Sequence, residues 1–562
     1  MEQTEESSNN STPKYITVNG AVKVFDSKSN GYRYLCREID IVTAKRDIIT
    51  SNITIELSCT YKGQKSTFEV GRETFAKSKI VEVLAQKGMD VNEGNSLGIL
   101  NYLYWKEKEV ECKNIHDRLG WTKIGNKELF LGYKVIQNGI ESVYNGDMDI
   151  APRGSYEQWK KVIDENVIGS KYLELALVLG FSSVVAAKLK SLIGLDVLFF
   201  HIYGKSTTGK TTALMVAASP FGRPCKDRNG MIRTWLATDN AIIAYLKDKN
   251  GIPMLLDEAS SRKNKDYTSM IYQIADGSNK GRADKNGNLR ENKVFSGTVL
   301  STAENSILAY SNHNNGLRVR LIELAQLPWT ESAEQAEILK SELSQNYGVA
   351  SDRFIEGIID YSDEEWIDAF KKSKKKVKQM MTMQDDFSSR TADKIAVIWL
   401  TAILVKRILE LDIDVDEVVK VLIDADAEQV QDRNMEQKAY ECILSEVRKN
   451  HHKFAVEDKI LKNDNDIEMP KGEYWGKIIM RKDKLHEILI KKEDLQKILS
   501  ENQFTDINTI LSTWRDKGVI DVDKGKSESK FTRKRVLFPR GKAERVIVIK
   551  ADKEYDQYQV ES

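Results

Sequence analysis

The chain is poor in cysteine and histidine, and it carries almost no net charge. Its 562 residues include five cysteines and six histidines, and no two cysteines form a C-x-x-C pair. This spacing argues against a zinc site and a disulfide framework, and it is typical of reduced cytoplasmic thiols. Because the formal net charge is only +1, any affinity for nucleic acid must come from local basic patches.

The sequence also lacks an apolar leader and an unbroken membrane span. Residues 1–14 are rich in Glu, Ser, Asn and Thr, which predicts a disordered tail. The most apolar stretch, residues 172–189, is interrupted by Gly180, Ser182 and Ser183, so we expect a buried pair of helices there. These features predict a cytoplasmic protein without a membrane partner.

Changes of pattern along the chain predict several domains, as the length requires. Alternating residues with turn signals predict an α+β domain over residues 15–150, including a strand at 32–41. Alternating strand and helix patterns predict an α/β nucleotide-binding domain over residues 151–440. Rising polarity then predicts a linker at 441–470, followed by a small basic domain at 471–562.

The most informative motif follows an apolar run that ends at Tyr203. Residues 204–211 read Gly-Lys-Ser-Thr-Thr-Gly-Lys-Thr, the G-x-x-x-x-G-K-T pattern of a phosphate-binding loop. Glycines let backbone N–H groups turn toward phosphate oxygens, and a following helix presents its positive end to the same anion. Lys210 would reach the β- and γ-phosphates of ATP, and the Thr211 hydroxyl would ligate Mg²⁺. The candidate nucleotide-binding residues are Gly204, Lys205, Ser206, Thr207, Thr208, Gly209, Lys210, Thr211 and Thr212.

A second apolar run, residues 252–256, ends in two carboxylates. At the phosphate edge of a sheet, Asp257 would hold Mg²⁺ and Glu258 would polarise the attacking water. A further strand is expected at residues 297–301. A polar group at its end can contact the γ-phosphate or the water. The candidates are Ser301, Thr302, Glu304 and Asn305, and we assign this catalytic contact to Thr302.

Three arginines complete the candidate nucleotide site. Arg318 and Arg320 fall at the start of an expected strand in residues 316–324. An arginine there can reach the ATP of a neighbouring subunit and neutralise transition-state charge, and both remain candidates for this role. Arg390 opens an apolar helix at residues 395–404 and can contact nucleotide. Because an arginine acting in trans requires a neighbour, a closed ring is the expected assembly.

Two basic segments are candidates for DNA binding. Residues 277–290 contain an Asn-Gly turn signal, which predicts a β-hairpin whose cations would grip phosphates inside a ring. Residues 492–550 read helix, helix, strand, loop, strand, as in a winged helix. The hairpin can instead be a solvated charged surface, and the winged helix can instead be a protein-docking module. The candidate DNA-binding residues are Lys280, Arg282, Lys285 and Arg290 in the hairpin and Arg533, Lys534 and Arg535 in the wing.

This order of parts resembles the AAA+ class. The hairpin before a sensor strand resembles the branch that holds minichromosome-maintenance helicases and superfamily III viral helicases. More narrowly, the chain resembles the mobile-element ATPases that include the cassette chromosome helicases of staphylococcal resistance islands. The matching segments are Gly120-Trp121, Trp159, residues 204–211, Thr234-Trp235, Thr238-Asp239-Asn240, Asp257-Glu258, Gly281-Arg282-Ala283, Leu300-Ser301-Thr302, Val319-Arg320-Leu321 and Arg390.

The resemblance covers about residues 20–410 and implies an α/β fold with an AAA+ core and an α+β N-terminal domain. The C-terminal winged helix is expected from its own pattern of helices and strands. It also implies an ATP-dependent, hexameric DNA helicase that replicates a mobile element, with replication proteins of that element as partners. The same ATPase motifs fit a remodeller or helicase loader that acts on protein. They also fit a DNA-binding regulator that uses ATP as a structural ligand.

Overall fold

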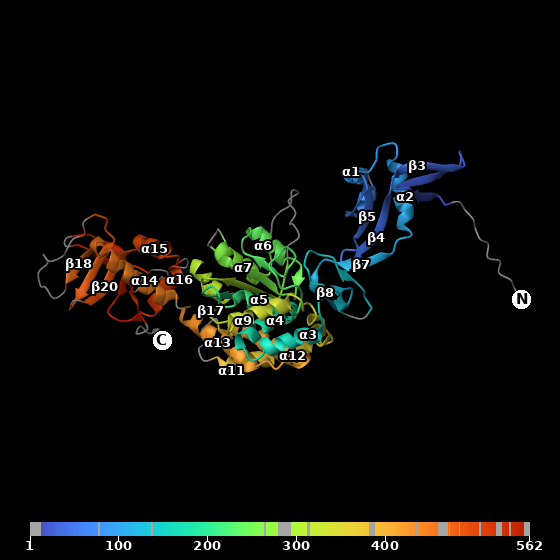
Figure 1. Ribbon diagram of the computed structural model, residues 1–562. Helices are drawn as coiled ribbons and strands as arrows, with labels where there is room; N and C mark the ends of the chain where they lie inside the picture. Colours follow the sequence, from blue (N-terminus) through green and yellow to red (C-terminus); the bar gives the residue numbers. More distant parts are fainter. Residues whose placement is uncertain are drawn as a thin grey trace. The chain divides into compact units, whose positions relative to one another are not determined.

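The computed structural model describes most of the chain (Figure 1). The described residues are 13–76, 79–136, 139–262, 266–278, 294–311, 315–381, 388–432, 435–458, 470, 472–482, 484–504, 507–523, 531–538 and 541–555. Residues 1–12 of the predicted tail therefore lie outside them. The chain divides into two compact units, Met1–Ile150 and Ala151–Ser562.

The first unit combines short sheets with two α-helices. Strands β1, β2 and β3 form one antiparallel sheet, and a second sheet has the order β11-β7-β4-β5-β6. The strands are β1 (Tyr15–Val18), β2 (Ala21–Asp26), β3 (Gly31–Arg37), β4 (Ile39–Asp47), β5 (Ile53–Tyr61), β6 (Gln64–Gly71), β7 (Cys112–His116), β8 (Leu119–Ile124), β9 (Lys127–Leu131), β10 (Val135–Ile136) and β11 (Val143–Tyr144). The helices are α1 (Lys79–Gln86) and α2 (Ser96–Glu107), and a 3₁₀ turn spans Arg72–Ala76.

The strand expected at residues 32–41 is two strands. β3 pairs with β2, whereas β4 pairs with β5. Between them, the backbone N–H of Glu38 donates to the carbonyl of Gly20 at 2.8 Å. The chain therefore passes from one sheet to the other at Glu38, and an alternating residue pattern does not reveal such a change of partner.

The second unit is organised around a five-stranded sheet of order β13-β15-β16-β12-β17. All of its pairings are parallel. Its strands are β12 (Leu198–Tyr203), β13 (Ile232–Thr234), β15 (Met254–Asp257), β16 (Thr298–Ala303) and β17 (Ile322–Ala325). Because the carboxyl ends of parallel strands meet at one edge, residues that follow β12, β15 and β16 come together in space.

The apolar stretch before this sheet forms one helix, α4 (Lys171–Ile193), and the expected pair of helices is wrong. A Cβ atom on Gly180 would lie 2.3 Å from the carbonyl oxygen of Ala217. The Ser182 hydroxyl hydrogen-bonds that of Thr298 at 2.7 Å. The small residues therefore permit close packing and do not break the helix. α4 is long and apolar enough to cross a membrane, but 78% of its most apolar window is buried, as in a core helix.

Further helices surround this sheet. α12 packs against α4 and α11, and α13 also contacts α4. The helices are α3 (Tyr156–Asn166), α5 (Lys210–Ala218), α6 (Asp239–Leu246), α7 (Thr268–Asp276), α8 (Asn315–Arg318), α9 (Ala333–Leu343), α10 (Ser351–Glu356), α11 (Asp363–Met380), α12 (Ser388–Leu409) and α13 (Val415–Asp432). The short strand β14 spans Lys249–Asn250, and a 3₁₀ turn spans Ala259–Ser261.

The C-terminal part has its own sheet of order β18-β19-β20-β23-β21, with β22 paired to β23. Its elements are α14 (Met435–Lys449), β18 (Phe454–Asp458), β19 (Gly476–Arg481), β20 (Lys484–Lys491), α15 (Lys492–Glu501), α16 (Ile507–Asp516), β21 (Ile520–Asp521), β22 (Arg533–Val536) and β23 (Ala543–Lys550). The order helix, helix, strand, loop, strand that the sequence predicts from residue 492 is present.

The linker predicted at 441–470 is wrong for residues 441–458. They form most of α14 and all of β18. Tyr440, Ile443 and Val447 of α14 belong to the same hydrophobic core as Trp514 of α16. The polar residues that suggested a linker lie on the outer face of an amphipathic helix, so this domain begins with α14.

Candidate functional site

The predicted phosphate loop lies between β12 and the first turn of α5. Residues Gly204, Lys205, Ser206, Thr207 and Thr208 follow β12, Gly209 precedes α5, and Lys210, Thr211 and Thr212 form its first turn. Gly209 has φ +83°, and a Cβ atom on it would lie 2.5 Å from the Thr330 hydroxyl oxygen. Only glycine satisfies both constraints. The loop is held from behind by the N–H of Trp329, which donates to the carbonyl of Thr208 at 2.9 Å.

The Lys210 side chain folds back beneath the loop. Lys210 is only 9% exposed. Its Nζ donates to the carbonyls of Gly204 and Lys205, each at 2.7 Å. Burial lowers the pKa of Lys210, while Glu258, Glu304 and Asp257 act in the opposite direction. A buried ammonium that is held by neutral carbonyls is poised to take an anionic partner.

Three residues that the sequence assigned separately lie together at the carboxyl edge of the sheet. Thr302 on β16 donates its hydroxyl to one carboxylate oxygen of Asp257, which ends β15. The same hydroxyl accepts the backbone N–H of Glu258 at 3.0 Å. On the other side, the Thr211 hydroxyl lies 3.4 Å from the second Asp257 oxygen. Asp257 thus stands between the phosphate loop and Thr302.

The serine before Thr302 has a different environment. The Ser301 hydroxyl accepts the Trp235 Nε1–H at 2.9 Å and hydrogen-bonds His201 Nδ1 at 3.0 Å. Both partners are buried, and burial lowers the pKa of His201 to about 4. Because successive strand residues point to opposite faces, Ser301 faces the core while Thr302 faces the carboxylates.

Glu258 adopts an unusual backbone conformation. Its φ of 62° and ψ of 65° lie in the left-handed region, which costs a residue other than glycine about 1–3 kcal/mol. The conformation is held by the Thr302 hydroxyl on its N–H and by Ser261, whose hydroxyl donates to the Glu258 carbonyl at 2.7 Å. This left-handed conformation turns the chain sharply after Asp257, so that the side chains of Asp257 and Glu258 take different positions.

Sequence reasoning missed Lys226. This residue follows α5, and its ammonium forms an ion pair with Asp257 Oδ2, the oxygen that also faces Thr211. It missed as well the contact of Ser206, whose hydroxyl donates to Glu304 at 2.7 Å. No motif marks Lys226, because its contact with Asp257 spans a loop without a regular pattern.

The arginines are placed differently from the expectation. Arg318 ends helix α8, and β17 begins only at Ile322, so neither candidate stands in a strand. The Arg318 side chain lies outside the described residues. The Arg320 guanidinium lies 4.6 Å from the Tyr272 ring centroid, and Nη1 donates to the Gly316 carbonyl at 2.9 Å.

Two further features concern Arg320 and Arg390. Arg320 Nε is buried without a hydrogen-bond partner among the described residues. Arg390 is exposed in the first turn of α12.

The two basic segments differ in whether the structure describes them. The hairpin residues Lys280, Arg282, Lys285 and Arg290 lie outside the described residues. In the wing, Arg533 forms an ion pair with Asp521, and Arg535 lies 3.2 Å from the same carboxylate. Lys534 is exposed between them on β22. Asp523 also lies 3.9 Å from Arg533 Nε. Two acidic residues therefore offset part of the charge that the sequence assigned to DNA.

Comparisons with known proteins match two parts of the chain to described families. Residues 16–294 match the family described as a domain of unknown function (DUF927). Residues 434–554 match the Cch helix turn helix domain, and this range begins at α14. No curated protein matches the chain.

A solved structure titled "SCCmec type IV Cch - active helicase" is similar over nearly the whole chain. The alignment covers 96% of this chain and 98% of that one, with a TM-score of 0.72 and 25% sequence identity. The chain thus shares the fold of that helicase and ends in a domain of the Cch helix-turn-helix type.

Proposed function

We propose that the chain is an ATP-driven AAA+ DNA helicase of a mobile genetic element, and that it works as a cytoplasmic ring. The observation that carries the proposal is the junction of Thr211, Asp257 and Thr302 at the carboxyl edge of the parallel sheet. Such an edge is where open α/β sheets bind ligands. The likeness to a helicase along 96% of the chain supports DNA as the substrate.

The residues at this edge fit a nucleoside triphosphate and Mg²⁺. Thr211 and Asp257 offer the hydroxyl and carboxylate oxygens that Mg²⁺ prefers, and the buried ammonium of Lys210 is held by the neutral carbonyls of the loop. When bound, Mg²⁺ would offset the negative charge of the phosphates. The loop glycines and the first turn of α5 would hold the phosphates.

In this proposal the remaining residues divide the work of hydrolysis. Glu258 polarises the attacking water, and Thr302 fixes the Glu258 backbone and the Asp257 carboxylate in register. Arg318 or Arg320 reaches the ATP of a neighbouring subunit, which is why the assembly is a homo-oligomeric ring, a hexamer by resemblance. Arg390 is proposed as a nucleotide contact, and the predicted hairpin and the wing as contacts to the DNA backbone.

A forked DNA substrate tests the proposal. Purified wild type with ATP and Mg²⁺ should separate the strands, and Lys210→Ala and Glu258→Gln should each lower hydrolysis and unwinding at least about 100-fold. Lys340→Ala, at an exposed position of α9, is the matched control and should leave both rates unchanged. Wild type that hydrolyses ATP but separates no fork, at any salt concentration or loading geometry, contradicts the helicase. Hydrolysis that ignores DNA altogether would favour a remodeller of protein.

A further inference from the structure

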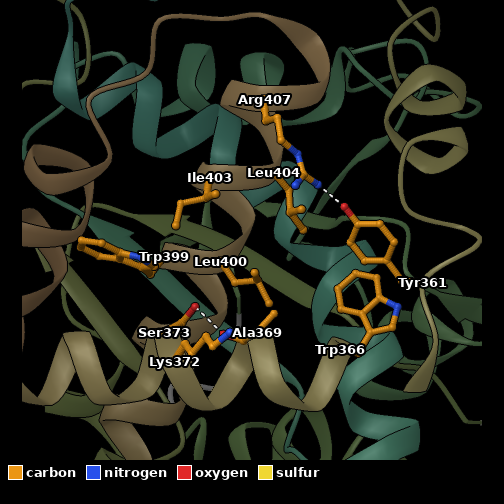
Figure 2. A pocket seen from close by; sticks show the side chains of 10 residues that line it. All are labelled: Tyr361, Trp366, Ala369, Lys372, Ser373, Trp399, Leu400, Ile403, Leu404 and Arg407. Carbon is orange, nitrogen blue, oxygen red and sulfur yellow. Dashed lines mark hydrogen bonds between the residues drawn. The ribbon is translucent and has the colours of Figure 1, made fainter. Parts of the chain in front are cut away.

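An apolar groove lies between α11 and α12, and none of its lining residues belongs to the candidate nucleotide site. Its volume is about 300 Å³, at the lower end of the range for ligand pockets. Figure 2 shows how the two helices line it. Its apolar lining includes Tyr361, Trp366, Trp399, Leu400, Ile403 and Leu404. The groove has room for one or two large apolar side chains.

The α12 side of the groove leaves one large side chain in solvent. Leu400 and Leu404 are 5% and 3% exposed, whereas Ile403 beside them is 40% exposed. All three lie on one face of α12, because residues three and four apart are neighbours on a helix. An exposed isoleucine above a recessed apolar floor is a surface that gains free energy when it is covered.

Cations stand at the margins of this groove. Figure 2 places Arg407 on one side and Lys372 on the other. Arg407 donates to the Tyr361 hydroxyl, and Lys376 lies 5.8 Å from the Trp399 ring centroid. The charged side chains that line the groove are therefore both positive.

The positive charge continues along α11. Residues 371–378 read Lys-Lys-Ser-Lys-Lys-Lys-Val-Lys, six lysines without one acidic residue. Lys372 pairs with Asp368 at 2.7 Å and Lys374 with Asp393 at 2.5 Å. Within the described part of the chain, the exposed side chains of Lys371, Lys375 and Lys378 form no ion pair. This dense charge repels itself and attracts an anionic occupant.

We propose that the groove between α11 and α12 docks an acidic peptide segment of a partner protein, with one or two large apolar side chains seated over Leu400, Ile403 and Leu404. The apolar floor selects the seated side chains, and the lysines select Asp and Glu on either side of them. Cationic margins around an apolar slot are the complement of an acidic amphipathic segment.

A peptide fits these observations better than DNA does. The recessed floor of leucine side chains offers nothing to phosphates. Two of its three rings offer a base little face for stacking, since Trp366 and Trp399 are only 1% and 9% exposed. This site goes beyond the proposed helicase activity, because none of its lining residues belongs to the candidate nucleotide site.

Selection from a phage-displayed library of random 12-residue peptides on the full chain, without nucleotide, tests the proposal. Enriched peptides should carry Asp or Glu around Leu, Ile, Phe or Trp. The synthetic consensus peptide, followed by fluorescence anisotropy, should bind about tenfold more weakly to Ile403→Glu. Lys372→Glu should also weaken it, and added salt should do so in wild type. Ile338→Glu and Lys340→Glu on α9 are matched controls, since Ile338 is 39% exposed.

Because Ile403 is exposed, we expect Ile403→Glu to fold like wild type. Circular dichroism and thermal unfolding check that the variant is folded, and Ile403→Ala is the second, milder variant. Peptides without acidic residues, or peptides that bind Ile403→Glu as well as wild type, overturn the proposal. A 20-nucleotide strand whose binding is lost in Ile403→Glu would assign the groove to nucleic acid. Self-association that only Ile403→Glu abolishes would assign it to a second copy. Either result overturns the peptide.

Discussion

Single hydroxyls and ammonium groups set the electrostatics of the candidate site. Asp257 receives the Thr302 hydroxyl on one oxygen and faces Lys226 and Thr211 with the other. Its negative charge is therefore already compensated in the chain itself. Any cation that enters must compete with Lys226 for one oxygen, and this competition is measurable.

Replacing Lys226 by alanine should lower the Mg²⁺ concentration that supports half-maximal ATP hydrolysis. The Lys226 side chain is 50% exposed, so the ion pair contributes roughly 0.2–1 kcal/mol after solvent screening, a shift of at most about fivefold. A Mg²⁺ titration of ATPase activity measures it, with Lys340→Ala as the control. A higher Mg²⁺ requirement would mean that Lys226 instead helps to hold the nucleotide.

Substitutions of Thr302 should affect ATP hydrolysis, whereas a substitution of Ser301 should affect stability. Thr302→Val removes the hydroxyl that joins Asp257 to the Glu258 backbone, and we expect hydrolysis to fall about 10- to 100-fold while Thr302→Ser retains it. Ser301→Ala leaves the Trp235 N–H and His201 without their partner, at a cost of about 1–3 kcal/mol in stability. Steady-state hydrolysis and thermal unfolding, measured on all three variants, distinguish the two roles. Equal losses of activity in Ser301→Ala and Thr302→Val would refute this division.

At the scale of elements, close contact explains why α4 is continuous. A helix of 23 residues with glycine and two serines at its centre packs directly on α5 and the sheet. Glycine weakens an exposed helix, but here the nearest atom belongs to the backbone of α5 and cannot move aside. Replacing Gly180 by alanine would therefore favour the helix locally but disturb the packing of α4 against α5.

Gly180→Ala should destabilise the second unit by about 1–3 kcal/mol, although alanine is the better helix former. A Cβ atom there meets the Ala217 carbonyl at 2.3 Å. Gly98→Ala in α2 is the matched control, because its Cβ would meet the movable Leu35 side chain at 2.6 Å. Denaturant midpoints of the two variants give the comparison. A Gly180→Ala protein at least as stable as wild type would show that α4 and α5 can move apart.

At the scale of the whole molecule, the proposed activity depends on a neighbouring copy. Arg320 stacks on Tyr272 of its own chain and leaves Nε without a partner among the described residues. A buried guanidinium nitrogen without a partner is costly, and a surface completed by another subunit would relieve it.

Mixing two inactive variants tests the exchange between subunits. Glu258→Gln and Arg320→Ala should each be inactive alone, whereas their mixture should regain a measurable part of the wild-type ATPase rate. Some interfaces then combine an intact Glu258 with an intact Arg320. The same mixture with Arg318→Ala identifies which arginine acts in trans. If neither of these two mixtures regains activity, although rings form in sedimentation, both arginines have structural roles.

The positions of residues 204–211 and of Asp257-Glu258 after buried strands could be predicted from the sequence, because each is a short run of adjacent residues between a strand and a helix or turn. Their roles toward ATP stay predictions. The strands and helices of the C-terminal domain from residue 492 were also legible from local periodicity. The predicted linker failed because polarity alone does not distinguish a loop from the outer face of α14.

Only the tertiary structure decided which groups meet. Thr302 reaches Asp257 across 45 positions of the chain, and Lys226 does so through a loop without a motif. The offset of Arg533 by Asp521 and the groove between α11 and α12 likewise join residues that the sequence keeps apart. Local patterns fix backbone conformation over a few residues, whereas contacts between distant residues follow from the packing of whole strands and helices.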